Sequence, residues 1–229
     1  MNAPSRLLLK LSGEAFRGEE GTLSPTCLGY LSEEIASLTH SELAIVIGGG
    51  NFIRGARSPW LDRIEADTLG MLATVLNALA LRAYLEGAGR KVVVQSAIAT
   101  ELTEPISPHK ACAAMTDGKV VIFAGGTGSP LVTTDTAAAL RGAAIGADLL
   151  AKGSNVAGVF TEDPKTGNTP RLLEDVSFDA FIAHRYGVMD LVAVEICREN
   201  ELPIVVFDLG KPGSLAALAA GKRVGTLIH

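Results

Sequence analysis

The sequence contains few cysteines, no long apolar run and no excess of basic residues. Cys27, Cys112 and Cys197 are widely spaced and form no Cys-x-x-Cys pair, so we expect reduced thiols in a cytoplasmic protein rather than disulfides or a zinc site. No stretch reaches the roughly 18 uninterrupted apolar residues of a membrane span. The formal net charge of -5 argues against a nucleic acid or an anionic membrane as a partner.

Five short apolar runs predict the strands of a sheet. They are rich in Val, Ile and Leu and show no polar alternation, which is typical of strands buried on both faces. The runs are Arg6–Leu9, Leu43–Ile47, Lys91–Gln95, Val120–Ala124 and Pro203–Phe207. Helical patterns lie between them, the clearest at Asp67–Glu86 and Thr134–Gly146. This alternation predicts one α/β domain, residues 1–229, around an open and mostly parallel sheet.

Glycine-rich segments follow three of the predicted strands. They are Lys10-Leu-Ser-Gly13, Gly48-Gly-Gly-Asn-Phe-Ile-Arg-Gly55 and Gly125-Gly-Thr-Gly-Ser-Pro130, and Thr133-Thr-Asp135 follows the last. One such segment is as easily a tight turn as a ligand site. Three at the carboxyl ends of parallel strands indicate a phosphate-binding crevice. Neither a GxGxxG fingerprint nor a Walker A loop is present, so a nucleotide would be bound by another arrangement.

Two lysines, Lys10 and Lys152, end apolar runs and precede small residues. A lysine at a strand end is most often a solvated rim residue, but two converging ammonium groups could stabilise a moving phosphoryl group. Asp135 would hold the pair in place, help to retain magnesium or simply begin a helix. Arg141 is interpreted as a helix-surface or interface charge. These features predict an ATP-dependent phosphotransferase that acts on a small anionic acceptor.

Ordered motifs along nearly the whole chain resemble those of bacterial uridylate (UMP) kinases, which belong to the amino acid kinase superfamily. The matching blocks are Leu8-Leu-Lys-Leu-Ser-Gly-Glu-Ala15, Gly48-Gly-Gly-Asn51, Gly70-Met-Leu-Ala-Thr74, Thr127-Gly-Ser-Pro130, Lys211-Pro-Gly213 and Gly225-Thr-Leu-Ile228. The resemblance implies a three-layer α/β/α sandwich and transfer of the γ-phosphoryl group of ATP, with Mg²⁺, to UMP.

The resemblance also implies a role for individual residues. The implied catalytic residues are Lys10, Lys152, Asp135 and Arg54. The implied ATP contacts are Lys10, Leu11, Ser12, Gly13, Gly50, Arg54, Ser154, Phe160 and Asp163. The implied UMP contacts are Gly49, Asp67, Thr127, Gly128, Ser129, Pro130, Leu131, Val132, Thr133 and Thr134. No residue of the chain is expected to form a metal site of its own.

Regulation and assembly are further implications of the resemblance. Similar enzymes are homohexamers, and many are activated by GTP through a loop matching Gly18, Glu19, Glu20, Gly21, Thr22 and Leu23, or inhibited by UTP. Ser129-Pro-Leu-Val132 stands where the family has Asn-Pro-Phe-Phe, which leaves the choice of base open. Two alternatives remain: another phosphotransferase of the superfamily, and a non-catalytic ATP and oxyanion store of the molybdenum-storage type.

Overall fold

The computed structural model describes residues 2–38, 41–54, 58–162, 167 and 169–229. In this part of the chain, nine strands form one sheet in the order β4-β3-β5-β2-β1-β6-β10-β11-β9. The strands are β1 (Arg6–Leu11), β2 (Glu42–Ile47), β3 (Val92–Ser96), β4 (Glu104–Pro105), β5 (Val120–Ala124), β6 (Leu149–Ser154), β9 (Asp175–Val176), β10 (Ile204–Asp208) and β11 (Thr226–Ile228). Every pair is parallel except β10 with β11. The mostly parallel sheet is therefore confirmed.

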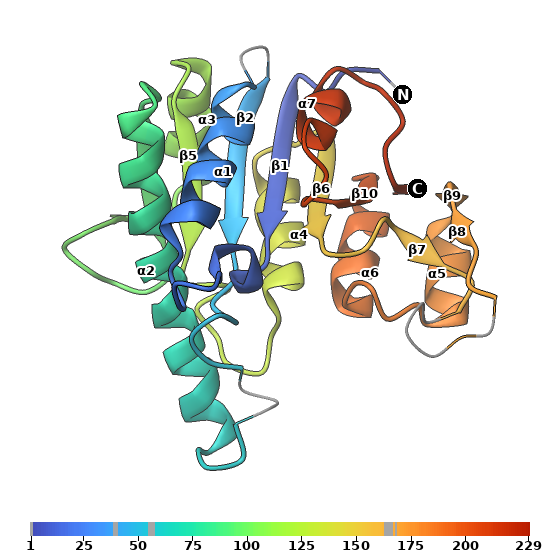
Figure 1. The fold of residues 1–229 in the computed structure, drawn as a ribbon, viewed down its shortest axis with the longest axis horizontal. Coiled ribbons are helices and arrows are strands. Elements are labelled where there is room, and N and C mark those ends of the chain that lie inside the picture. Colours follow the sequence, from blue (N-terminus) through green and yellow to red (C-terminus); the bar gives the residue numbers. More distant parts are fainter. Residues whose placement is uncertain (1, 39–40, 55–57, 163–166, 168) are drawn as a thin grey trace.

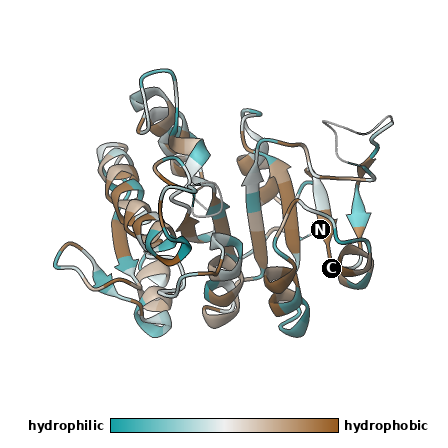
Figure 2. Cartoon of the chain, turned by 90° about the horizontal axis from the view of Figure 1, so that it is seen from below, coloured by the Kyte–Doolittle hydropathy of each residue, from teal (hydrophilic) through white to brown (hydrophobic). Residues whose placement is uncertain are grey.

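Helices cover both faces of this sheet (Figure 1). One face packs against α1 (Pro25–Ala36), α2 (Arg63–Gly87) and α7 (Ser214–Ala219). The other packs against α3 (Pro108–Thr116), α4 (Thr134–Ala144), α5 (Phe178–His184) and α6 (Leu191–Glu199). Two apolar cores result, one on each side of the sheet, and hydrophobic strands run between the helices in Figure 2. This arrangement is the expected three-layer sandwich.

Shorter elements lie beside the sheet. A 3-10 turn, η1 (Gly13–Phe16), follows β1 directly. Strand β7 (Val159–Phe160) pairs antiparallel with β8 (Leu172–Leu173) in a separate two-stranded sheet. The residue before β7 is Gly158, where a Cβ would lie 2.3 Å from Oγ1 of Thr226.

Helix α2 is long and apolar enough to cross a membrane by length and composition, a criterion that core helices of soluble proteins also meet. Its carboxyl-terminal part packs against the sheet, burying Ala73, Ala78, Leu81 and Leu85, while its first turns project past the strands in Figure 1. Its opposite face carries exposed apolar side chains, which are Ile64, Leu69, Leu72, Leu76 and Tyr84. The helix therefore has two apolar faces, of which the sheet covers one.

Candidate active site

The alternation of side chains along β1 and β6 decides which face of the sheet receives the two lysines. On β1, Leu7, Leu9 and Leu11 enter the core beneath α1 and α2, whereas Leu8 enters the core beneath α4. Since side chains two residues apart share a face, Lys10 lies on the α4 side. Lys152 lies there too, because it follows Leu150 on β6. The parallel register places Lys10 directly opposite Lys152.

Asp135, in the first turn of α4, lies between the two ammonium groups. Its Oδ1 is 2.8 Å from Nζ of Lys10, and its Oδ2 accepts a hydrogen bond of 2.5 Å from Nζ of Lys152. All three side chains are buried, with 7 to 8% of each residue exposed. We call these three residues the lysine–aspartate cluster. Two cations and one carboxylate leave it with a net positive charge, which suits phosphate groups.

The cluster shifts the pKa of two of its members. Although burial opposes it, the charges of Lys10 and Lys152 hold the pKa of Asp135 well below its ordinary value. Burial, together with the charge of Lys10, lowers the pKa of Lys152 to about 8, and Asp135 opposes this fall. Near neutral pH Asp135 is therefore ionised and Lys152 is mostly charged, close to its titration point.

Asp190, which the sequence analysis missed, ties the cluster to its surroundings. Its backbone N–H donates to Oδ2 of Asp135 at 3.3 Å. Its carboxylate accepts hydrogen bonds from the hydroxyls of Thr133 (2.7 Å) and Thr136 (2.9 Å) and caps α6 through the N–H of Val192. The signal in the sequence was an acidic residue immediately before a helical pattern, which is also what a plain N-cap looks like.

A cavity of about 1170 Å³ opens on one side of the cluster. Both lysines line it, together with Ser12, Arg54, Ser154 and Phe160 from the predicted ATP set. Arg54 lies at this cavity but is exposed and pairs with Glu14 at 2.6 Å. Leu11 is fully buried in the core, so only its backbone faces a ligand. Asp163, predicted to contact ATP, lies outside the described residues.

Close backbone approach explains the glycines of the loops after β1 and β2. A Cβ on Gly13 would lie 2.4 Å from the backbone nitrogen of Gly50, and a Cβ on Gly49 would lie 2.1 Å from the carbonyl oxygen of Gly70 on α2. Buried Asn51 and Asn77 exchange side-chain hydrogen bonds of 2.8 and 2.9 Å beside the loop, an amide pair that the sequence analysis also missed. The loops after β1 and β2 are therefore packed together without room for side chains.

The segment between β5 and α4, residues 125–133, forms a loop on the other side of the cluster. We call it the acceptor loop, after its predicted role. Asp67 on α2 accepts the backbone N–H of Leu131 at 2.9 Å and also pairs with Arg63. Leu131 has φ of +67°, a left-handed conformation that is rare for leucine. Thr133 caps α4 with its hydroxyl. Of the predicted UMP contacts, Asp67 and the acceptor loop therefore touch each other, whereas Gly49 packs against Gly70 on α2.

Comparison with known proteins places the chain in a family. Residues 5–208 match the model of the amino acid kinase family. The chain belongs to the amino acid kinase family. Chloroplastic uridylate kinase PUMPKIN of Arabidopsis thaliana is 46% identical over 97% of this chain and 68% of its own length. The fold and the resemblance inferred from the motifs are therefore confirmed.

Solved structures of kinases in this family have the same fold. UMP kinase from Bacillus anthracis superposes with a TM-score of 0.95 at 34% identity, covering 100% of this chain and 97% of that one. UMP kinase from Ureaplasma parvum gives a TM-score of 0.92 at 31% identity, covering 98% of both chains. The match therefore extends through β1, α4 and β6, which carry the lysine–aspartate cluster.

The predicted effector loop, residues 18–23, forms a compact turn between η1 and α1. Gly18 and Gly21 make two mutual backbone hydrogen bonds of 3.1 and 3.2 Å. The carboxylate of Glu20 accepts hydrogen bonds from Ser24 and Thr26, and these hydroxyls lower its pKa. Asn51 donates to the carbonyl of Thr22, which connects the turn to the loop after β2.

Carboxylates near the cluster are already engaged. Both oxygens of Asp135 face lysines, Glu14 pairs with Arg54, and Oδ1 of Asp208 accepts the N–H of Gly210. Within the described ranges, no group of three or more His, Cys, Asp or Glu residues is placed to hold a metal ion.

Proposed function

We propose that this protein transfers the γ-phosphoryl group of ATP to UMP, giving ADP and UDP. The observation that carries the proposal is the lysine–aspartate cluster, which lies between a large cavity and the acceptor loop at the carboxyl ends of β1 and β6. The relatives named above are uridylate or UMP kinases, and the similarity to them spans nearly the whole chain.

The cluster suits direct transfer without a covalent enzyme intermediate. A phosphate oxygen of UMP attacks the γ-phosphorus of ATP while the bond to the bridging oxygen breaks, so the leaving group is ADP. Lys10 and Lys152 stabilise the charge that spreads over the transferring oxygens, and Asp135 holds both ammonium groups in position. Magnesium bound to ATP supplies further charge neutralisation when the nucleotide is present.

The remaining predicted residues divide between the two substrates. In our proposal ATP occupies the large cavity, where its phosphates meet Ser12, Ser154 and the exposed Arg54. UMP lies along the acceptor loop, with its phosphate directed at the cluster and its ribose near Asp67. Because Asp67 already accepts the N–H of Leu131, a ribose hydroxyl would share that carboxylate with the loop.

An ADP-release assay tests the activity with UMP, CMP, dUMP, AMP and GMP as acceptors. We expect UMP to have the highest kcat/KM. Equal rates with all five acceptors would refute the uridylate assignment but leave phosphotransfer in place. Stoichiometric molybdenum or tungsten in the purified protein, without turnover, would instead support an oxyanion store and refute the enzymatic proposal.

Assembly follows from the second apolar face of α2, which the sheet leaves exposed. We propose that Leu69, Leu72 and Leu76 pack against another copy of the chain, in a homo-oligomer such as a hexamer. Light scattering after size-exclusion chromatography would give the mass, and Leu72→Glu should reduce it. A monomeric wild-type protein would contradict the proposal.

Regulation, localisation and domain organisation complete the proposal. We propose a single folding unit in the cytoplasm, activated by GTP and inhibited by UTP. Rate measurements at fixed UMP and ATP with each effector test the regulation, and calorimetry tests whether unfolding occurs in one transition. The Arabidopsis relative is chloroplastic, so fractionation of the source cells is the test of localisation.

A further inference from the structure

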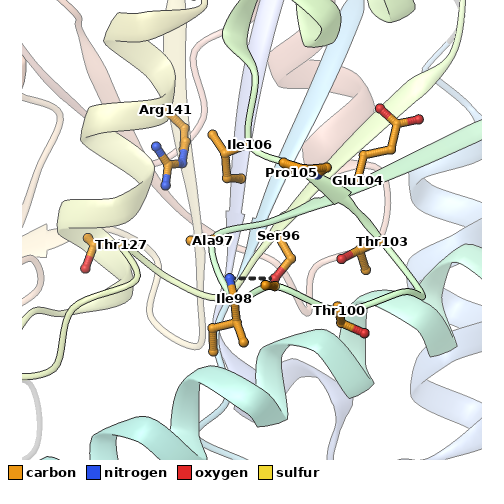
Figure 3. Close-up of a pocket in the computed structure, with 11 residues that line it drawn as sticks. Ser96, Ala97, Ile98, Thr100, Thr103, Glu104, Pro105, Ile106, Thr127 and Arg141 are labelled. Carbon is orange, nitrogen blue, oxygen red and sulfur yellow. Dashed lines mark hydrogen bonds between the residues drawn. The ribbon is translucent and has the colours of Figure 1, made fainter.

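A second cavity, of about 450 Å³, lies at the carboxyl ends of β3 and β4, beside the acceptor loop (Figure 3). Its walls come from the segment after β3, from Thr127 of the acceptor loop and from Arg141 on α4. The hydroxyl of Ser96 accepts the N–H of Ile98 at 3.0 Å and so fixes the turn that forms one wall. The cavity is therefore continuous with the loop to which we assign UMP.

Arg141 brings an uncompensated charge to this cavity. Its Nε is buried and has no hydrogen-bond partner, and its Nη2 reaches only the carbonyl of Gly126, at 3.4 Å. Among the described residues no carboxylate lies within the 4.0 Å of an ion pair, and Glu104, on the same wall, points away in Figure 3. Burial lowers the pKa of this guanidinium. A buried guanidinium nitrogen without an acceptor is unfavourable unless a ligand supplies an acceptor oxygen.

Other groups of the cavity narrow the chemistry of that ligand. Oγ1 of Thr103 is buried without a partner, which leaves a hydroxyl able to accept or donate. Ile98 and Ile106 supply apolar walls. The hydroxyl of Thr127, by contrast, is already bonded to the backbone of Ser129. A flat ring with carbonyl oxygens and an N–H group matches these walls, the hydroxyl and the donor-only guanidinium.

We propose that Arg141 is a specificity-determining residue that donates a hydrogen bond to O4 of the uracil ring and thereby rejects cytosine. Uracil presents O2, O4 and an N3–H group, whereas cytosine presents an amino group in place of O4. A guanidinium has five N–H donors and no acceptor, so it pairs with a carbonyl oxygen and leaves an amino group unpaired. This inference rests on the proposed function, since it concerns the base of the same acceptor.

The acceptor loop itself offers little that distinguishes the two bases. Ser129, Leu131 and Val132 are exposed, and two of them carry no polar side-chain atom. The selectivity for a carbonyl oxygen therefore comes from outside the loop, from α4. The sequence alone did not indicate this, because an arginine in the last turn of an alanine-rich helix has the pattern of a surface charge.

The test is the ratio of kcat/KM for UMP to that for CMP in the full chain carrying Arg141→Gln. A glutamine amide can present either its oxygen or its NH₂ group, so it accepts both bases. We expect the ratio to fall roughly 10- to 100-fold, the scale of one hydrogen bond to a charged group. Arg198→Gln, on the exposed side of α6 with its own ion pairs, is the matched control and should keep the wild-type ratio.

Two further measurements keep the inference separable from folding and from the proposed function. Thermal unfolding shows whether Arg141→Gln is folded; if it is not, the wild type is assayed with 4-thio-UMP, whose sulfur accepts a hydrogen bond more weakly than O4, and kcat/KM must be lower than with UMP. A wild-type enzyme that phosphorylates UMP, with a folded Arg141→Gln variant whose ratio stays within twofold, would overturn the inference and leave the function standing. Absence of UMP phosphorylation in the wild type would refute the function itself.

Discussion

Replacing Asp135 with asparagine tests whether the lysine–aspartate cluster stabilises the fold as well as the reaction. The change keeps the shape of the side chain but leaves Lys10 and Lys152 facing each other without a carboxylate between them. Loss of one partner from a buried ion pair costs about 3–5 kcal/mol. In a chain of this length, each kcal/mol of lost stability lowers the melting temperature by about 2–4 °C, so we expect a decrease of about 6–20 °C.

The loss of unfolding free energy in Asp135→Asn should be larger at low pH. Asp135 normally raises the pKa of Lys152, which is about 8 in the folded protein, so the variant's lysine should titrate below that value. Below pH 8 the unfolded variant then holds a proton that its folded state has lost, and its stability rises with pH. In the wild-type protein Lys152 keeps its proton below about pH 8, so it causes no such rise in stability there. The difference in unfolding free energy is therefore larger at pH 6 than at pH 8.

Urea unfolding at these two pH values, with activity measured in parallel, is the assay. Asp179→Asn is the matched control, because that side chain is 84% exposed and its ion pair with Arg198 is 3.4 Å long. We expect the control to change stability by no more than about 0.5 kcal/mol. If Asp135→Asn is as stable as this control at pH 6 and retains wild-type kcat, the account of the cluster given above is wrong.

Three other predictions concern the same region. Lys10→Ala should lower kcat at least about a hundredfold, the scale of one lost charge-stabilising donor, in single-turnover assays; wild-type turnover would remove it from the catalytic set. The kcat of the wild type should fall as pH rises through about 8 because Lys152 loses its proton, whereas residual activity of Lys152→Arg should stay level to pH 10. Gly49→Ala should destabilise the protein by about 1–3 kcal/mol because its Cβ meets the carbonyl of Gly70, while Gly29→Ala, which meets nothing within 4 Å, should not.

The strands were predictable because they are apolar on both faces. Continuous runs such as Val120–Ala124 have one physical explanation in a chain of this composition, burial within a parallel sheet. The helix at Asp67–Glu86 was predictable from its period, but the period does not say which apolar face meets the sheet. Ala78 and Leu81 lie on the face that meets the sheet, whereas Leu72 and Leu76 face outward.

The residue types of the site were predictable, but their contacts were not. Lysines at strand ends could be found by inspection, whereas the register that sets Lys10 opposite Lys152 joins positions far apart in the sequence. Asp190 and Arg141 gave only the signals of a helix cap and a helix surface. Their roles depend on which loops fold against them, and this is decided by the packing of α4 and α6 rather than by local sequence.

The order of the cluster along the chain has a consequence for synthesis. Its members come from β1, from the start of α4 and from β6, so a growing chain cannot assemble it until residue 152 has emerged and β6 has paired with β1. Pairing over such a separation is slow relative to helix formation, because loop closure must come before the contacts that compensate for it. No amino-terminal fragment ending before β6 can therefore carry partial activity, and the site is completed only when the centre of the sheet has folded.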